Sequence, residues 1–282
     1  MSYLTFHLVF IFPPILLLGW ALLRTDPGAR TALLGVRWPW AIAAVAGIAF
    51  VYTTPWDNYL VYREIWWYGP DRVLGTIGYV PVEEYLFFLL QPVLTGLWCY
   101  HLLLRRRGAA EWGLGEVPGL RMESPSTRPG LVRVLTALPW FLLTGLGVWL
   151  LTFDAGLYMG LILAWASPVV GLMWLYMGPR LWRFIHVIGL AVAVPTLYLW
   201  FADIVAMGQG IWEISHSYTL GPRPLSLPIE EATFFLITNV LVVTGSLLFL
   251  IPGMAALDPA EGQALDPSAS PTVPSNHGRV RE

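Results

Sequence analysis

Charge is scarce in this sequence, and one basic residue type is missing altogether. Only 12% of the 282 residues are charged, which is about half the share of an average soluble domain. So little charge excludes an ordinary soluble enzyme and a disordered chain. All 16 basic residues are arginines, and the chain contains no lysine. The absence of lysine excludes a side-chain Schiff base and a P-loop, because both require a lysine amine.

Cysteine is almost absent too, since Cys99 is the only one. This excludes a disulfide scaffold, an iron–sulfur cluster and a cysteine-based zinc site. The net charge of −2 provides no basic field for nucleic acid. Histidines are few and show no pair at ligand spacing, so we expect no metal site. The sequence also lacks an aspartate-rich cluster for magnesium diphosphate and a complete dinucleotide-binding fingerprint, so we expect no cofactor.

What the sequence has in abundance is apolar residues, at 56% of the chain. A membrane-spanning helix needs about 20 mostly apolar residues, and the chain contains seven such stretches. They cover roughly residues 3–23, 38–55, 80–104, 134–152, 156–177, 183–202 and 228–251. The sequence therefore predicts an all-α integral membrane protein with seven transmembrane helices. Pro13 and Pro14 predict a kink in the first of these helices.

The arginines predict how the chain is oriented. Thirteen of the 16 fall between the spans on one side, and only Arg63, Arg72 and Arg223 fall on the other. By the positive-inside rule the N-terminus is outside and the C-terminus is in the cytoplasm, as in a multi-pass protein of the cell's inner membrane. Residues 252–282 lack aromatic residues and are rich in proline and serine, so we expect a disordered cytoplasmic tail.

An internal repeat is the most informative feature. The stretch from Asp57 to Phe88 recurs from Asp203 to Phe235, with one extra residue in the second copy. The matched positions include Ile65-Trp66 with Ile211-Trp212, Leu74-Gly75 with Leu220-Gly221, and Pro81, Glu83, Glu84, Phe87 and Phe88 with Pro228, Glu230, Glu231, Phe234 and Phe235. Because four spans separate the copies, the halves have the same orientation, which makes this a parallel repeat. Both acidic loops then emerge on the outer face, where they can converge.

This repeat predicts the organisation of the whole chain. Residues 1–104 form a first three-helix repeat, 105–155 a cytoplasmic loop with a connector helix, and 156–251 a second three-helix repeat. The tail 252–282 follows. The sequence does not determine the oligomeric state, and a homo-oligomer is compatible with it.

A Pro-x-Glu-Glu motif begins the third and the seventh span. Proline and acidic residues also suit the start of any helix, so a single copy would be equally well explained as structural. Two copies at membrane boundaries favour a functional site, because carboxyl groups in apolar spans are costly. Each glutamate has a phenylalanine four residues later on the same helix face. The candidate proton-transfer residues are Glu83, Glu84, Glu230 and Glu231, backed by Phe87, Phe88, Phe234 and Phe235.

Aromatic and charged residues in the two loops extend the candidate site. An interfacial belt of Trp and Tyr explains many of these rings, but Trp66 and Trp212 recur in register and can stabilise a carbocation with their ring faces. Asp57 and Asp203 recur as well, either as further acids or bases or as helix-end groups bonded to Arg63 and Arg72. We expect Arg72 and Arg223 to pair with one glutamate of each motif.

The stretch from Trp56 to Gln91, with Trp66, Gly75 and Pro81-Val82-Glu83-Glu84, resembles the small membrane-integral lycopene cyclases. The resemblance is to the fused form of this family and covers roughly residues 1–251. The second copy departs from the motif where Ala202 replaces Trp56 and Ile204 replaces Asn58. The resemblance implies an intramolecular lyase or isomerase for lycopene, a carotenoid substrate that dissolves in the bilayer. An acid protonates a terminal double bond, a neighbouring double bond closes the ring, and a base removes a proton to leave a β-ring.

Two other functions compete with this interpretation, and the sequence argues against a third. A proton-coupled transporter would share the parallel repeat and the intramembrane acids. A non-catalytic carotenoid-binding protein would keep the aromatic residues but not need the glutamate pairs. A retinal-binding receptor with a covalent Schiff base is excluded by the absence of lysine.

Overall fold

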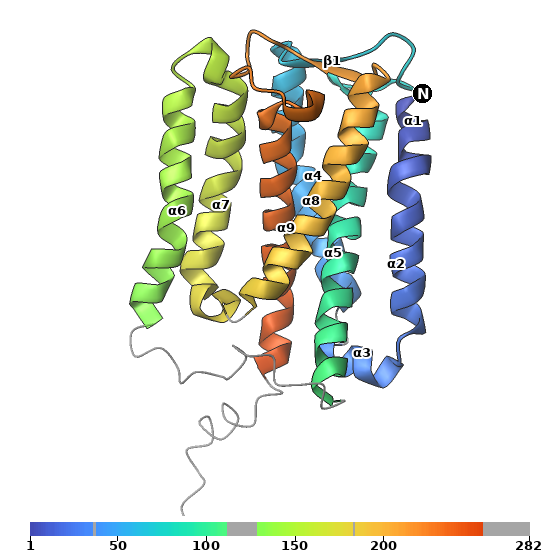
Figure 1. Ribbon diagram of the computed structural model, residues 1–282, viewed down its shortest axis with the longest axis vertical. Helices are drawn as coiled ribbons and strands as arrows, with labels where there is room; N and C mark the ends of the chain where they lie inside the picture. Colours follow the sequence, from blue (N-terminus) through green and yellow to red (C-terminus); the bar gives the residue numbers. More distant parts are fainter. Residues whose placement is uncertain (36–37, 112–128, 183, 256–282) are drawn as a thin grey trace, which may run out of the picture.

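Helices make up most of the described chain, which comprises residues 1–35, 38–111, 129–182 and 184–255 of the computed structural model. The long helices run along a common direction, with the N-terminus and the two loops that carry β1 (Trp66–Tyr68) and β4 (Trp212–Ile214) at one end (Figure 1). We call this the loop end. The short helix α3 (Pro27–Leu34) lies at the opposite end. The prediction of a mainly helical protein is confirmed.

The first predicted span forms one long helix with an irregular segment near its start. It consists of α1 (Tyr3–Phe6), the π-helical η1 (His7–Ile11) and α2 (Phe12–Arg24). Pro14 has no N–H to donate to the carbonyl of Phe10 four residues earlier. The Tyr198 hydroxyl, which is 2.7 Å away, donates to that carbonyl instead. The proline pair therefore coincides with an irregular segment of the helix. A tyrosine from a neighbouring helix supplies the hydrogen bond that the backbone carbonyl lacks.

The other predicted spans also form helices. They are α4 (Trp38–Tyr62), α5 (Val82–Glu111), α6 (Pro129–Leu150), α7 (Leu157–Trp182), α8 (Ile185–Gly208) and α9 (Ile229–Ala255). Six helical segments of the described chain are long and apolar enough to cross a membrane. Helix α4, which corresponds to the predicted span 38–55, is not among them. Its last turns contain Thr53, Thr54, Asp57 and Asn58, which lower its hydropathy.

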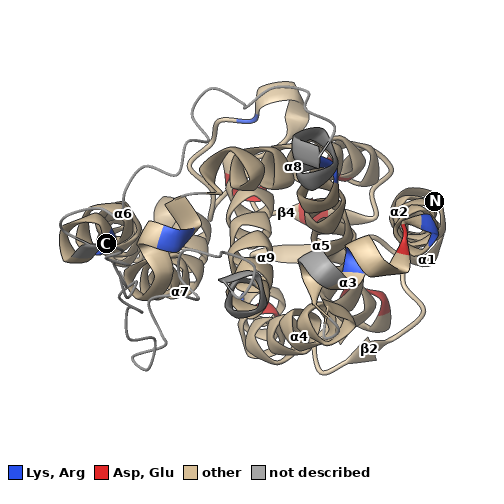
Figure 2. Ribbon diagram, turned by 90° about the horizontal axis from the view of Figure 1, so that it is seen from below, with Lys and Arg blue, Asp and Glu red and all other residues tan. Residues whose placement is uncertain are grey.

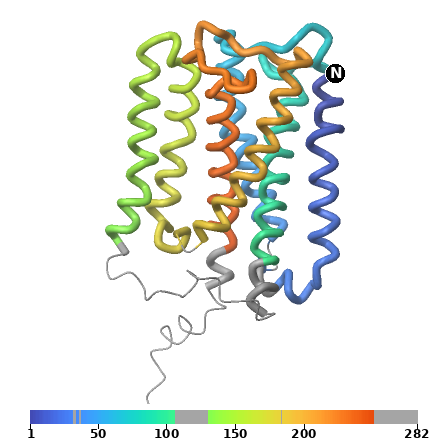
Figure 3. The backbone as a smooth tube through the Cα atoms, viewed as in Figure 1, coloured from blue at the N-terminus to red at the C-terminus, as the bar shows by residue number. Residues whose placement is uncertain are grey.

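Helices α4, α5, α8 and α9 surround the centre of the bundle, as the view along the helices shows (Figure 2). Helix α5 packs against α2, α4, α8 and α9. Helix α7 packs against α9, and α6 lies outside against α7 (Figure 3). The α6–α7 contact depends on small residues, because a Cβ at Gly147 would lie 2.6 Å from the amide nitrogen of Ala164.

Short strands join the two loops at the loop end, and the sequence did not predict them. β1 pairs with β4 in antiparallel register, with Trp66 opposite Ile214 and Tyr68 opposite Trp212. A smaller ribbon pairs β2 (Thr76–Ile77) with β3 (Val80–Pro81), directly before α5. The 3₁₀ turns η2 (Asp154–Gly156) and η3 (Pro224–Ser226) precede α7 and α9.

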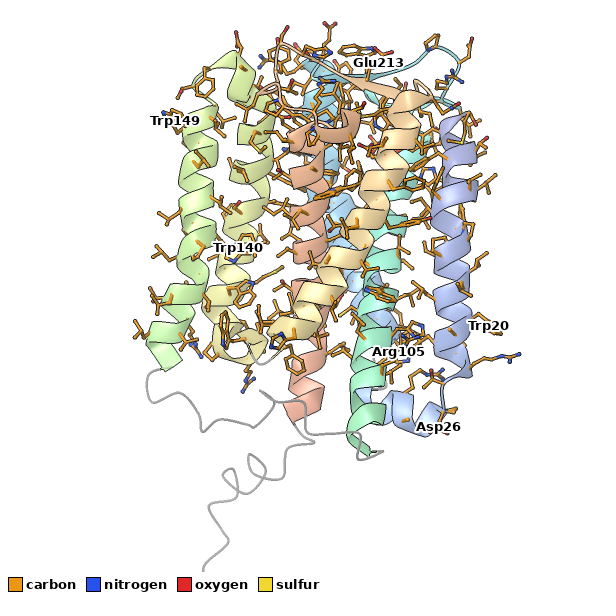
Figure 4. The ribbon with its side chains drawn as sticks, viewed as in Figure 1. Trp20, Asp26, Arg105, Trp140, Trp149 and Glu213 are labelled. Atoms are coloured by element: carbon orange, nitrogen blue, oxygen red, sulfur yellow. The ribbon has the colours of Figure 1, made fainter. Side chains whose placement is uncertain are left out.

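Charged residues mark the two ends of the bundle. In Figure 4, Glu213 lies at the loop end, whereas Arg105 and Asp26 lie at the opposite end. Trp20 on α2 and Trp149 on α6 are both more than half exposed and point away from the bundle. The predicted tail at 252–282 and the long loop that follows α5 fall largely outside the described residues.

Candidate functional site

The pairing of β1 with β4 brings the two matched loops into contact. The amide of Gly69 donates to the carbonyl of Ile211 at 3.0 Å, and the amide of Ser215 donates to the carbonyl of Ile65 at 2.9 Å. Gly69 corresponds to Ser215 in the sequence repeat, and Ile65 to Ile211. Each bond is therefore the equivalent of the other, with donor and acceptor halves interchanged. The loops therefore form one cover over the ends of α4, α5, α8 and α9.

The first glutamate of each motif anchors the loop that precedes its helix. Glu83 Oε1 accepts a hydrogen bond from the amide of Leu74 at 2.9 Å, and Glu230 Oε1 accepts one from the amide of Leu220 at 2.7 Å. Both side chains are buried. This position satisfies a backbone donor in each loop that would otherwise be unpaired.

The expected pairing of Arg72 and Arg223 with these glutamates is wrong. The Arg72 guanidinium donates to the carbonyl of Met1 at 3.3 Å, and Arg223 donates to the carbonyl of Ile214 at 3.3 Å. Backbone amides bind Oε1 of Glu83 and of Glu230, and the two arginines bind carbonyl groups of the backbone instead of these glutamates. The alternative that Asp57 and Asp203 bond to arginines is also wrong, because in the described part of the chain neither oxygen of Asp57 has a hydrogen-bond partner and Asp203 accepts from Trp212.

The second glutamate of each motif is bound by tyrosines. Tyr3 donates to Glu84 Oε2 at 2.6 Å, and Tyr68 donates to the same oxygen at 3.1 Å. Tyr158 donates to Glu231 Oε1 in a short contact. Desolvation, together with the charge of Glu84, raises the pKa of the Tyr68 phenol well above its ordinary value, so this residue keeps its proton to donate.

Tyr3 and Tyr158 are the residues that the sequence interpretation missed. They occupy the starts of α1 and α7, where their amides donate to the carbonyls of Arg72 and Tyr218. Arg72 corresponds to Tyr218 in the repeat, so the two tyrosines occupy matching places although their surrounding sequences are dissimilar. Because the dissimilar surroundings give no repeated motif, only the fold identifies these two tyrosines as equivalent.

Asp57 and Asp203 approach the same site from the ends of α4 and α8. Asp203 Oδ1 accepts a hydrogen bond from Trp212 Nε1 at 2.9 Å. Neither carboxyl oxygen of Asp57 has a hydrogen-bond partner, and neither does the indole nitrogen of Trp66. The two halves therefore differ at this point, although their residue types match.

Aromatic rings from both halves enclose these carboxyl groups. Tyr3 contacts Trp212 with ring centroids 5.0 Å apart, and Trp66 meets Tyr158 edge-on at 5.7 Å. Tyr3, Trp66 and Trp212, together with Glu84, Asp203 and Glu231, line a small chamber. Its remaining lining residues are Phe6, Tyr68, Phe87, Leu199, Phe234 and Phe235. The chamber encloses about 30 Å³, which is room for about one water molecule.

A larger apolar groove adjoins the chamber. It encloses about 320 Å³ between α4, α5, α7 and α9, and its walls include Tyr52, Trp165, Phe88 and Gly245. Phe87 and Phe234 line both the groove and the chamber and so separate them. A large ligand can pass from groove to chamber only if these rings move. Phe88, which we expected to lie behind Glu84, lines the groove but not the chamber.

This arrangement is suited to proton transfer in an apolar space. Within the described residues no ion pair joins a carboxyl group of the site to an arginine, so four buried carboxyl groups share one region without a cation. Because like charges in one buried region repel each other, we expect at least one of these groups to carry a proton. The same residues include no group of three or more side chains arranged to hold a metal ion.

Comparisons with known proteins agree with one another. A family model described as lycopene cyclase matches residues 1–103 and 149–249. The lycopene beta-cyclase of Halobacterium salinarum is 42% identical over 248 residues, covering 88% of this chain and 95% of the relative. The bifunctional lycopene cyclase/phytoene synthase of Sporisorium reilianum is 33% identical over 88% of this chain and 35% of its own length. No solved structure matches. The chain therefore belongs to the lycopene cyclase family.

Proposed function

We propose that this protein is a lycopene β-cyclase that closes the acyclic ends of lycopene into β-rings, a step of carotenoid biosynthesis. The observation that carries the proposal is the convergence of Glu84 and Glu231, from the two matched halves, on one chamber of aromatic rings. Buried carboxyl groups supply and remove protons, and aromatic faces stabilise the positive charge that forms between those steps. The relatives named for this activity support the same conclusion.

The reaction needs only proton transfer. A carboxylic acid adds a proton to the terminal double bond, and the resulting cation is attacked by a neighbouring double bond to close a six-membered ring. A carboxylate then removes a ring proton and leaves a new double bond. One proton enters and one leaves, so substrate and product are isomers. We therefore assign the activity to the intramolecular lyases and expect it to need no redox cofactor.

Each candidate residue has a place in this scheme. Glu84 and Glu231 are the proton-transfer pair, while Glu83 and Glu230 hold the loops over it. The rings that face the cation are those of Trp66, Trp212, Phe87, Phe234 and Phe235. Asp203 lines the chamber beside the two acids, and Asp57 lies close to it. The apolar groove receives the polyene chain of lycopene. Phe87 and Phe234 must turn aside to admit an end group, because the chamber is nearly filled.

We further propose that α4 is a seventh transmembrane helix and that residues 1–104 and 156–251 form a parallel repeat joined by the connector α6. Three matched features support the repeat: the exchanged bonds between the loops, the amide anchors of Glu83 and Glu230, and the family model's match to two separate segments. The arginine distribution supports an inner-membrane protein with its N-terminus outside.

Reporter fusions at two positions test this orientation. Alkaline phosphatase inserted between β1 and α5 should be active, because that loop is expected outside. A fluorescent protein fused after α5 should be fluorescent, because that end is expected in the cytoplasm.

The activity is tested by expressing the chain in bacteria that accumulate lycopene and separating the pigments by chromatography. Cyclised carotenes should replace lycopene in cells with the wild-type chain. A double variant with Glu84→Gln and Glu231→Gln should leave lycopene unchanged while accumulating in the membrane at wild-type level. Unchanged lycopene with the wild-type chain present in the membrane would contradict the cyclase proposal.

A further inference from the structure

The two glutamates of the chamber have unequal hydrogen-bond partners. Glu84 Oε2 accepts from two phenols, Tyr3 at 2.6 Å and Tyr68 at 3.1 Å. Glu231 accepts from one, Tyr158. The repeat places Ile214 where the first half has Tyr68, and Ile214 has no hydroxyl to donate. The second phenol therefore has no counterpart at Glu231.

This difference determines which carboxyl group more readily carries negative charge. A carboxylate accepts hydrogen bonds and is stabilised by each donor, whereas a carboxylic acid must use one oxygen to carry its proton. Two phenol donors on a single oxygen therefore favour the ionised form of Glu84. One donor leaves Glu231 with the weaker stabilisation of charge.

Two aspartates lie around the pair, within electrostatic reach of both glutamates, so they do not distinguish one from the other. Asp57 is buried, and neither of its oxygens has a hydrogen-bond partner, so an ionised Asp57 would be an uncompensated buried charge. Asp203 accepts from Trp212 at one oxygen and has no partner at the other. His7, the nearby titratable ring in η1, has Nδ1 3.0 Å from the carbonyl oxygen of Tyr3, while its Nε2 is buried without a hydrogen-bond partner among the described residues.

We propose, building on the cyclase function, that the two halves have different roles: Glu231 is the acid that starts cyclisation, and Glu84 is the base that ends it. Tyr68 is a positioning residue that holds Glu84 ready to accept the ring proton. In each catalytic cycle the O–H bond of Glu231 breaks as a C–H bond forms at the terminal alkene. After ring closure a ring C–H bond breaks, its electrons form the ring double bond, and Glu84 takes the proton. A proton then returns from Glu84 to Glu231, so the cycle balances without an oxidant or reductant.

The assignment predicts different products from the two single variants. Without its acid, Glu231→Gln should leave lycopene uncyclised, because no cation forms. Glu84→Gln should still form the cation, which then loses a proton from another neighbouring carbon or captures water. In either case the released proton returns to the Glu231 carboxylate. Its products should therefore carry rings with misplaced double bonds or a hydroxyl group. The glutamine keeps the shape of the side chain and its acceptor oxygen, so both variants are expected to fold.

Tyr68→Phe tests the positioning role with a smaller change. Losing one hydrogen bond to a charged group should slow β-ring formation about tenfold and raise the share of misplaced double bonds. Tyr62→Phe is the matched control, because Tyr62 is exposed at the same end of the bundle and contacts Tyr79 rather than a glutamate. It should behave as wild type in rate and in product.

The experiment compares the pigments of wild type and of these variants in lycopene-producing bacteria, with ring double bonds assigned by nuclear magnetic resonance. Membrane abundance and elution of the detergent-solubilised protein confirm folding. The role assignment is overturned if folded Glu84→Gln leaves lycopene untouched, if its β-ring yield equals wild type, or if Glu231→Gln gives misplaced double bonds. Failure of the wild-type chain to form any ring would instead refute the proposed function.

Discussion

At the scale of single residues, adjacent glutamates have separate tasks. Glu83 and Glu84 are neighbours in the chain, but about 100° of helix rotation separates their side chains. Glu83 faces the amide of Leu74, while Glu84 faces the chamber. The same division holds for Glu230 and Glu231. The motif thus combines a structural anchor with a group that can react.

Substitution by glutamine should separate these two tasks. In Glu83→Gln the amide oxygen still accepts from Leu74, so cyclase activity should stay within about threefold of wild type. In Glu84→Gln a proton acceptor is lost, and β-ring formation should fall by roughly 100-fold or more. Carotene yields, normalised to membrane protein, measure both. An equal loss of activity in the two variants would contradict the separation.

The aromatic face of Trp212 should matter apart from its indole nitrogen. Trp212→Phe and Trp212→Leu both remove the hydrogen bond to Asp203, but only the first keeps a ring beside the expected cation. Because a cation–π contact contributes about 0.5–2 kcal/mol, the leucine variant should be slower than the phenylalanine variant. Initial rates with lycopene in membrane preparations give the ratio. Identical rates would show that the ring only fills space.

At the scale of elements, the strands β1 and β4 determine where both halves place their reactive residues. Their pairing requires a close approach at Gly69, where a Cβ would lie 2.2 Å from the carbonyl oxygen of Gly210. No flexible side chain can move aside there, because the obstacle is backbone. The sequence repeat matches Gly69 with Ser215, so the requirement belongs to one half only.

Gly69→Ala should therefore separate the loops without altering a catalytic side chain. Steric overlap of this kind costs about 1–3 kcal/mol, so both the thermal stability and the cyclase rate should fall. Gly75→Ala is the control, because a Cβ at Gly75 would meet no atom within 4 Å. Thermal unfolding in detergent and pigment yield are the measurements. If Gly69→Ala resembled Gly75→Ala, the loop pairing would not hold the site together.

At the scale of the whole molecule, the groove between α4, α5, α7 and α9 leads to the chamber. Gly245 lines the groove, and a Cβ there would make only ordinary contacts with Val45 and Met173. A large side chain at this position would occupy the space proposed for the polyene. Gly47 lies on α4, another helix that borders the groove. It is exposed, and a Cβ there would meet no atom within 4 Å.

Gly245→Phe should consequently block the substrate while leaving the acids in place. We expect the rate at limiting lycopene to fall about tenfold or more, which corresponds to a loss of at least about 1.4 kcal/mol of apolar contact. Gly47→Phe should have little effect, because its ring would lie outside the groove. Conversion in membranes supplied with lycopene, together with melting temperature, measures both variants. Normal conversion by Gly245→Phe would place the polyene elsewhere.

One chamber shared by both halves also predicts the order of products. Glu84 and Glu231 line the same chamber, so the described part of the chain offers one proton-transfer site for the two ends of lycopene. The two ends must then be cyclised in succession. In a time course, a monocyclic carotene should appear before the bicyclic product and then decline. Simultaneous appearance of bicyclic product, with no monocyclic intermediate at any time, would favour two independent sites.

Much of this protein follows from its sequence. Long apolar runs have to form helices in a bilayer, because no water is present there to satisfy backbone groups. The repeat of Asp57–Phe88 indicated two matched loops and the glutamate pairs. Tyr3 and Tyr158 could not be found in this way, because they come from other helices and reach the glutamates only in the folded bundle.

The sequence by itself thus determined a helical membrane chain, its acidic motifs and the chemistry they favour, because composition and periodicity are local properties. Only the tertiary structure decided how those motifs are used. Helix rotation turned Glu83 and Glu230 toward backbone amides and Glu84 and Glu231 toward the chamber. The pairing of β1 with β4 joined the two loops over one site. These outcomes depend on contacts between residues far apart in the chain, which no local pattern encodes.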